Sequence, residues 1–180
     1  MNFNMIKILS RLALTLSIVF SAGHSSLAQS NTEPMSEMLT KQKSEAGVFI
    51  SRTARLLLDV QSQVAKGKVF NGDFSAAVNH TRQAIALYKS GSFRRAAMHA
   101  EFARRLAVKA SNANKGKVDA SLVNLNEQEK SIMNGPKLDD AELVNEVAKL
   151  MKGKPVVSEA NLVSGALNDL GQSALNTVLK

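Results

Sequence analysis

The sequence Gly72-Asp-Phe-Ser-Ala-Ala-Val-Asn-His-Thr-Arg-Gln-Ala84 recurs 19 residues later as Gly91-Ser-Phe-Arg-Arg-Ala-Ala-Met-His-Ala-Glu-Phe-Ala103. Both copies hold glycine, phenylalanine, alanine, histidine and a further alanine at the same spacing. Glycine permits a sharp turn between helices, and small alanines let two helices approach closely. The repeat predicts antiparallel helices over 74–89 and 93–110, because only a short turn separates them. Their expected N-caps are Asp73 and Ser92.

The flanking sequence extends this hairpin into an all-α protein. Apolar residues recur at steps of three and four over 36–66, which predicts a long first helix with one buried face. Asp139 and Glu142 form a capping box for a later helix, and Ser158 caps a last helix that reaches about Leu179. No segment alternates apolar and polar residues as a strand would. The expected fold is a three-helix unit built on the hairpin, followed by a C-terminal helical pair.

The N-terminus has the features of an export signal. A basic start precedes an uncharged apolar run, Leu12–Phe20, and Ser26 and Ala28 fit a small-residue cleavage site. The run is shorter than the roughly 20 residues that span a bilayer, although an uncleaved anchor is the alternative. We therefore expect a secretory signal peptide over 1–28, a mature chain that begins at Gln29, and a periplasmic or secreted protein.

Charge and composition divide the mature chain into segments. The whole chain has a formal charge of +8. Residues 41–117 hold fifteen Lys and Arg against four Asp and Glu, whereas 118–180 hold six against nine. The predicted units are a disordered leader over 29–35, a basic helical domain over 36–112, a linker over 113–136 and the C-terminal helical pair over 137–180.

Several classes of chemistry are excluded by what the sequence lacks. There is no cysteine, which removes disulfides, thiolate metal sites and a cysteine nucleophile. No glycine-rich nucleotide loop, zinc-protease motif or serine-hydrolase motif is present. The acidic cluster Asp139, Asp140 and Glu142 is explained by helix capping and the helix dipole. We therefore predict a protein that is not an enzyme and needs no cofactor.

One part of the chain resembles a known family. Ala86-Leu-Tyr-Lys-Ser-Gly-Ser-Phe-Arg-Arg-Ala96, continuing to Ala103, is similar to a tetratricopeptide hairpin, in which an aromatic residue, a Gly-x-aromatic turn and a helix lined by alanines follow one another. The resemblance covers about 40 residues, and its period of 19 differs from the 34 of the family. It implies a helical hairpin that binds peptides or proteins and carries out no chemistry of its own.

His80 and His99 occupy the same position of the repeat. In an antiparallel hairpin they lie at nearly the same height on facing helices, where two imidazoles could share a metal ion. Two ligands do not complete a site, and neither inner helix face offers an acid at a matching step. Two half-buried histidines with local hydrogen bonds are the alternative interpretation.

A helical wheel of 93–110 gathers cations on its outer side. They are Arg94, Arg95, Arg105 and Lys109, with Arg104 at the flank of this face. Arginine suits bidentate capture of carboxylate or phosphate, but a solvated helix surface needs no ligand. Met98 and Phe102 share this side, which predicts a contact surface or a seam against the first or the C-terminal helix.

Three functions fit these observations. The first is an exported, non-enzymatic helical binding or adaptor protein that contacts a protein or an anionic envelope component through the cations above. The second is sequestration of a metal or small ligand by His80 and His99. The third is a structural part of an envelope assembly. Export argues against intracellular nucleic acid as the partner.

Overall fold

Helices make up the regular structure of the chain. The computed structural model describes residues 33–155, 157–165 and 167–178. Within these ranges there is no strand, so the all-α prediction is confirmed. The helices in chain order are α1 (Glu33–Gly67), α2 (Asp73–Lys89), α3 (Phe93–Ala113), α4 (Ala120–Val123), α5 (Glu127–Ile132), α6 (Asp140–Met151), α7 (Glu159–Ser164) and α8 (Asn168–Val178).

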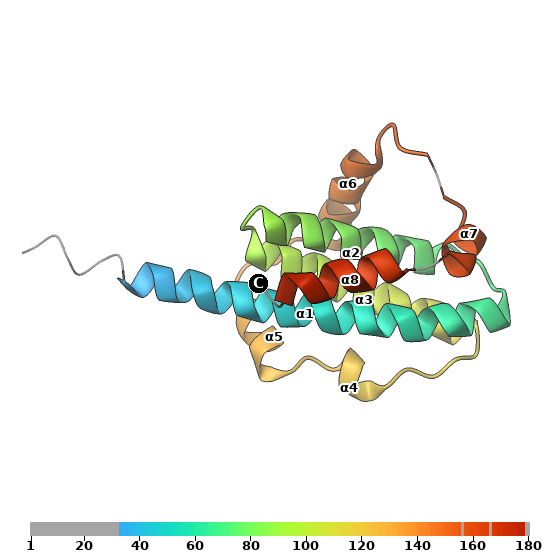
Figure 1. Ribbon diagram of the computed structural model, residues 1–180, viewed down its shortest axis with the longest axis horizontal. Coiled ribbons are helices and arrows are strands. Elements are labelled where there is room, and N and C mark those ends of the chain that lie inside the picture. Colours follow the sequence, from blue (N-terminus) through green and yellow to red (C-terminus); the bar gives the residue numbers. More distant parts are fainter. Residues whose placement is uncertain (1–32, 156, 166, 179–180) are drawn as a thin grey trace, which may run out of the picture.

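α2 and α3 form the antiparallel hairpin that the repeat predicts, and α1 lies along both of them (Figure 1). Gly91 makes the turn at a φ of +81°, which glycine adopts without strain. Phe74, Ala77 and Ala96 are completely buried between the helices. The fully buried apolar side chains of α1 that cover the hairpin are Phe49, Ile50, Leu56, Leu57, Val60 and Val64. The core therefore lies where α1, α2 and α3 meet.

The N-terminal capping of the two hairpin helices differs from the prediction. Gly72, at a φ of +90°, is the N-cap of α2, and Asp73 is its first helical residue. The capping carboxylate comes from α7, where Glu159 accepts hydrogen bonds from the backbone N–H groups of Gly72 at 2.8 Å and Ser75 at 3.0 Å. Ser92 is the N-cap of α3 as predicted, but its side chain makes no capping hydrogen bond.

Residues 113–136, which the sequence predicts as a linker, include α4 and α5 and pack on α1 and α3. Asn126 and Glu129 form a capping box at the start of α5, and Glu129, Ile132 and Met133 are buried. Arginines of α1 and α3 hold this segment in place, and its local sequence does not reveal that contact. With four and six residues, α4 and α5 are too short to form a helical hairpin comparable to that of α2 and α3.

The C-terminal region 137–180 is more divided than a helical pair. The capping box of Asp139 and Glu142 starts α6, and Ser158 caps α7, both as predicted. The last predicted helix breaks at Gly165, whose backbone is extended. α6 packs on α2 and α3, whereas α7 and α8 pack on α1 and α2. Within the described ranges, α6 has no packing contact with α7 or α8.

α1 extends beyond the rest of the bundle at its N-terminal end (Figure 1). It begins at Glu33, inside the segment 29–35 that the sequence predicts as a disordered leader. The predicted signal peptide over 1–28 lies outside the described residues. None of the described helices combines the length and the apolar character that crossing a bilayer requires.

Candidate functional site

His80 of α2 and His99 of α3 meet inside the hairpin, as their shared repeat position predicts. Their Nδ1 atoms are 3.0 Å apart, and the two rings stack with centroids 5.2 Å apart. Phe102 packs edge-on against His80 at 4.6 Å between centroids. Both histidines are buried. The two histidines therefore form a direct hydrogen bond between the two hairpin helices.

A carboxylate from α6 determines where the protons of this pair lie. Glu146 has one oxygen 3.0 Å from Nε2 of His99 and accepts a hydrogen bond from Arg95 at 2.6 Å on the other. A carboxylate only accepts, so Nε2 of His99 carries its proton and its Nδ1 is the acceptor. Nδ1 of His80 therefore donates to His99. The four side chains form one hydrogen-bonded chain from the surface to the core.

Burial keeps both imidazoles neutral. The pKa of His80 falls to about 4 because burial penalises the charged ring and His99 lies beside it, while Asp140 acts in the opposite direction. Burial also lowers the pKa of His99, and its hydrogen bond to Glu146 partly opposes that shift. Burial acts to raise the pKa of Glu146, but the hydrogen bonds from His99 and Arg95 outweigh it and leave the pKa lowered.

The histidine pair offers a metal ion two convergent nitrogens and no third ligand. Glu146 contacts the opposite ring nitrogen of His99, so its carboxylate does not point toward the space between the two Nδ1 atoms. Among the residues that the structure describes, no group of three or more His, Cys, Asp or Glu side chains is placed to hold a metal. The geometry supports a buried polar contact that fixes the hairpin.

Most of the predicted cationic surface of α3 is occupied by the chain itself. Arg105 makes a bidentate pair with Asp140 of α6, at 2.9 and 2.6 Å, which lowers the pKa of that carboxyl. Arg95 holds Glu146, and Arg94 donates to the backbone carbonyl of Pro136 at 2.6 Å. Only Lys109 of the predicted set is exposed and has no ion pair within the described residues.

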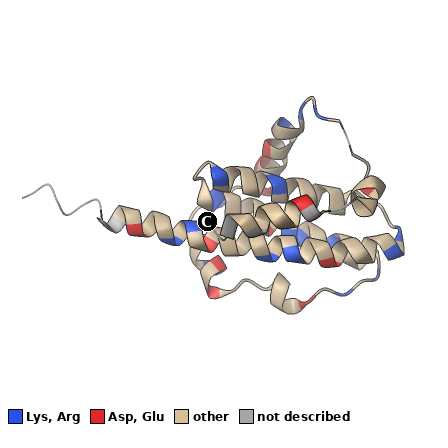
Figure 2. Ribbon diagram, viewed as in Figure 1, with Lys and Arg blue, Asp and Glu red and all other residues tan. Residues whose placement is uncertain are grey.

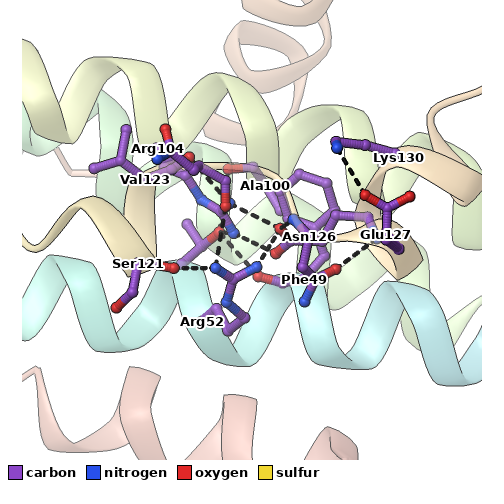
Figure 3. A network of polar contacts seen from close by, with 12 residues as sticks. Phe49, Arg52, Ala100, Arg104, Ser121, Val123, Asn126, Glu127 and Lys130 are labelled. Carbon is purple, nitrogen blue, oxygen red and sulfur yellow. Dashed lines mark hydrogen bonds and ion pairs between the residues drawn. The ribbon is translucent and has the colours of Figure 1, made fainter.

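Arg104, predicted at the flank of the outer face of α3, is not at the surface, because the segment 117–133 covers it. It is 2% exposed and holds Glu129 with two hydrogen bonds, of which the shorter is 2.6 Å. Arg52 of α1 binds the same carboxylate and also donates to the carbonyl of Asn124 at 3.1 Å. Figure 3 shows Arg52 and Arg104 pointing into this cluster from α1 and α3. The guanidinium of Arg104 also stacks on Phe49, 4.5 Å from the ring centre.

Met98 and Phe102 form a seam, one of the two arrangements that the sequence leaves open. They are 5% and 7% exposed. Met98 lines a small cavity with Leu138 and Leu143, so the seam lies against the region that leads into α6. The alternative of an open contact surface at these two residues is therefore wrong.

A cleft lies at the turn of the hairpin. It has a volume of about 750 Å³ and lies between α1, the α2–α3 turn and α8. Tyr88 and Phe93 contribute an edge-to-face aromatic pair with centroids 5.3 Å apart. Lys43 and Lys89 line it on one side, and residues of α8 complete it: Asp169, Gln172, Ser173 and Asn176.

The sequence analysis missed Glu129 and Glu146 as partners of the arginines and histidines. Both lie far along the chain from those partners, and only the capping box at Glu129 left a local signal. It also missed a recurring tetrapeptide, Lys-Gly-Lys-Val, at 66–69 and 115–118. A search for identical short segments within the sequence identifies this repeat.

Comparison with protein-family models, with curated proteins and with solved structures finds no match to this chain. The tetratricopeptide-like resemblance therefore stays a prediction. Function is inferred below from the residues of this chain alone.

Proposed function

We propose that the protein is an exported, non-enzymatic helical binding protein that acts as an adaptor and contacts a protein partner through the free end of α1. The export signal that the sequence predicts over 1–28 supports a periplasmic or secreted location. The hydrogen bonds that hold the histidine pair and the α3 arginines within the chain favour a scaffold over a catalyst.

The observation that carries this proposal is an apolar stripe that continues past the bundle. Met35, Met38 and Leu39 are 61%, 51% and 46% exposed. Eighteen residues make five helical turns, so Met35 has the same direction on α1 as buried Thr53. The face of α1 that packs on α3 inside the bundle is therefore the same face that is uncovered at the free end. We call Met35, Met38 and Leu39 the free stripe.

The free stripe favours an amphipathic helix as the occupant. Its apolar residues recur at steps of three and four, which is the spacing that a second helix covers with its own apolar side. Lys43, close by on α1, lines the cleft beside Tyr88 and Phe93, so a helix on the stripe has a partly aromatic surface next to it. Aromatic side chains supply large contact areas at interfaces.

Site-specific photocrosslinking tests the proposal. A benzoylphenylalanine placed at Leu39 of the full chain, expressed in the cells that make it, should yield one discrete adduct with another protein. Ser44 lies on the opposite side of α1 and is exposed, so the same reagent there is the matched control. Met38→Glu should remove the adduct at Leu39, because a charge on the stripe opposes burial.

An adduct that forms equally from Ser44, or that persists in Met38→Glu, would overturn the proposal. The absence of any adduct at Leu39 would also overturn the proposal. An adduct of twice the mass of the chain would identify a second copy as the occupant and would replace the adaptor role by self-association.

A further inference from the structure

Two copies of Lys-Gly-Lys-Val lie together at one end of the bundle. The first, at 66–69, begins in the last turn of α1, and the second, at 115–118, follows α3. This end is opposite to the free stripe, because α1 begins at one end of the molecule and finishes at the other (Figure 1). In Figure 2 the loops at this end carry basic segments.

The two loops are locked to each other by amide side chains. Asn114 accepts a hydrogen bond from the backbone N–H of Val69 at 2.9 Å and donates to its carbonyl at 3.1 Å. Gln63 donates to the carbonyl of Lys117 at 2.8 Å. The glycines of both copies are needed for this fit, because a Cβ at Gly67 would lie 2.3 Å from Asn114 and one at Gly116 would lie 1.8 Å from Gln63. The loops therefore form a fixed surface.

This surface combines exposed cations with exposed apolar groups. Val69 and Phe70 are 42% and 45% exposed, although both are large and apolar. Lys68 and Lys115 have φ angles of +56° and +54°, in the left-handed region that is uncommon for residues other than glycine. Such backbone conformations gather at functional positions. We call the set the lysine tip: Lys66, Lys68, Lys115, Lys117, Val69 and Phe70.

Among the residues that the structure describes, no ion pair joins a lysine of the tip to an acidic side chain. Neither 66–72 nor 114–118 contains Asp or Glu. The acids that flank these segments bond elsewhere: Asp73 accepts from Asn71 at 2.8 Å, and Asp119 accepts from the backbone of Ser121 at 2.8 Å. Glu159 is 8% exposed and caps α2. The tip therefore presents four exposed lysines beside two exposed apolar side chains.

We propose that the lysine tip binds the surface of a bilayer that contains anionic phospholipids. Lysines near such a surface are attracted to the phosphates, and exposed apolar side chains gain by entering the boundary between head groups and acyl chains. A dissolved polyanion would satisfy the lysines but would leave Val69 and Phe70 in water. The combination of both features at one rigid end favours the bilayer. This inference is independent of the free stripe, which lies at the opposite end of α1.

Vesicle sedimentation with the mature chain tests the proposal. Vesicles of phosphatidylglycerol and phosphatidylcholine in equal amounts should bind the protein, and vesicles of phosphatidylcholine alone should not. Replacing Lys68 and Lys117 by Gln should weaken binding about 25-fold, because each lysine contributes about a factor of five. Replacing the exposed Lys130 and Lys137 by Gln makes the same charge change elsewhere and should cost less than threefold.

A fluorescence measurement distinguishes insertion from charge attraction. The chain has no tryptophan, so Phe70→Trp supplies a single reporter. Its emission should shift to shorter wavelength with anionic vesicles and stay unchanged with heparin. Val144→Trp, at an exposed apolar position on α6, should show no shift with either.

Three results would overturn the proposal: no binding to anionic vesicles, equal losses in the tip and control variants, or binding without a shift at Phe70→Trp. Binding without that shift would indicate a surface that binds polyanions in general and does not enter the bilayer. None of them alters the crosslink expected at Leu39, so the two proposals fail separately.

Discussion

Burial in the hairpin favours the neutral forms of His80 and His99, so protonating either ring places a charge in the core. Their Nδ1 atoms are 3.0 Å apart, which leaves room for one proton between them. The charged groups around His80 are Asp140 and Arg105, and those around His99 are Glu146 and Arg95. These neighbours do not offset burial, so the pKa of each ring stays below its ordinary value.

Acid should therefore destabilise the protein before its carboxylates titrate. The unfolded chain protonates His80 below pH 6.5, whereas the folded protein does so only near pH 4, so the unfolded state binds more protons in between. Stability is complete above pH 6.5 and falls toward pH 4, by roughly 2–3 kcal/mol between pH 6.5 and 4.5. Urea unfolding at several pH values measures this loss.

His80→Gln is the control for the acid effect, because it removes the titrating ring and keeps a polar side chain. Its stability should depend less on pH between 6.5 and 4.5. An unchanged pH slope in this variant would contradict the assignment. Glu146 contributes at lower pH, since its ordinary pKa is 4.5 and the folded protein lowers it further.

At the scale of the helices, end contacts connect elements that are distant in the sequence. Glu159, on the short helix α7, supplies the carboxylate that binds the first N–H groups of α2. A negative charge there also interacts favourably with the positive N-terminal end of the α2 dipole. The cap is thus supplied from the C-terminal region and ties α7 to the hairpin.

Glu159→Ala should lower the free energy of unfolding by about 1–2 kcal/mol, because it removes a cap and leaves N–H groups of α2 unpaired in a nearly buried position. Thermal or urea unfolding gives the value. Asp59→Ala, at an exposed position of α1, removes the same charge without a cap and should change stability by less than about 0.5 kcal/mol. Equal stabilities of the two variants would show that the cap contributes nothing.

The sequence predicts those elements whose signals are local. The 19-residue repeat places the hairpin and the histidine pair correctly, and the capping box at Asp139 and Glu142 places α6. Segment 113–136 looks like a linker because its helices are short and polar, and the Glu129 contacts that order it come from α1 and α3. A helical wheel likewise places Arg104 outside, since it contains no information about what covers a helix.

For the molecule as a whole, Glu129 is the point at which three parts of the chain are joined. Its side chain is completely buried and is bound by Arg52 of α1 and Arg104 of α3. The backbone N–H of Asn126 adds a hydrogen bond at 3.0 Å. Two guanidinium groups share one carboxylate, so removing that charge leaves both of them without a counter-ion in or near the core.

Glu129→Gln should destabilise the protein by about 3–5 kcal/mol, the usual cost of leaving a buried charge without its partner. Urea unfolding followed by the helical circular dichroism signal measures this. Glu127→Gln is the matched control, because Glu127 is exposed and pairs with the exposed Lys130 at 2.7 Å. It should cost less than about 0.5 kcal/mol. Similar midpoints for both variants would show that the buried ion pairs do not support the fold.

The length of α1 sets the distance between the free stripe and the lysine tip. Its 35 residues correspond to about 50 Å at 1.5 Å per residue, and the three-helix core stiffens the half that it covers. The free stripe and the lysine tip sit at the two ends of this rod. If the lysine tip binds a bilayer with α1 perpendicular to the membrane plane, the other end of α1 lies roughly 50 Å above the lipid phosphates. The length of α1 would then set the distance between the membrane and the protein partner.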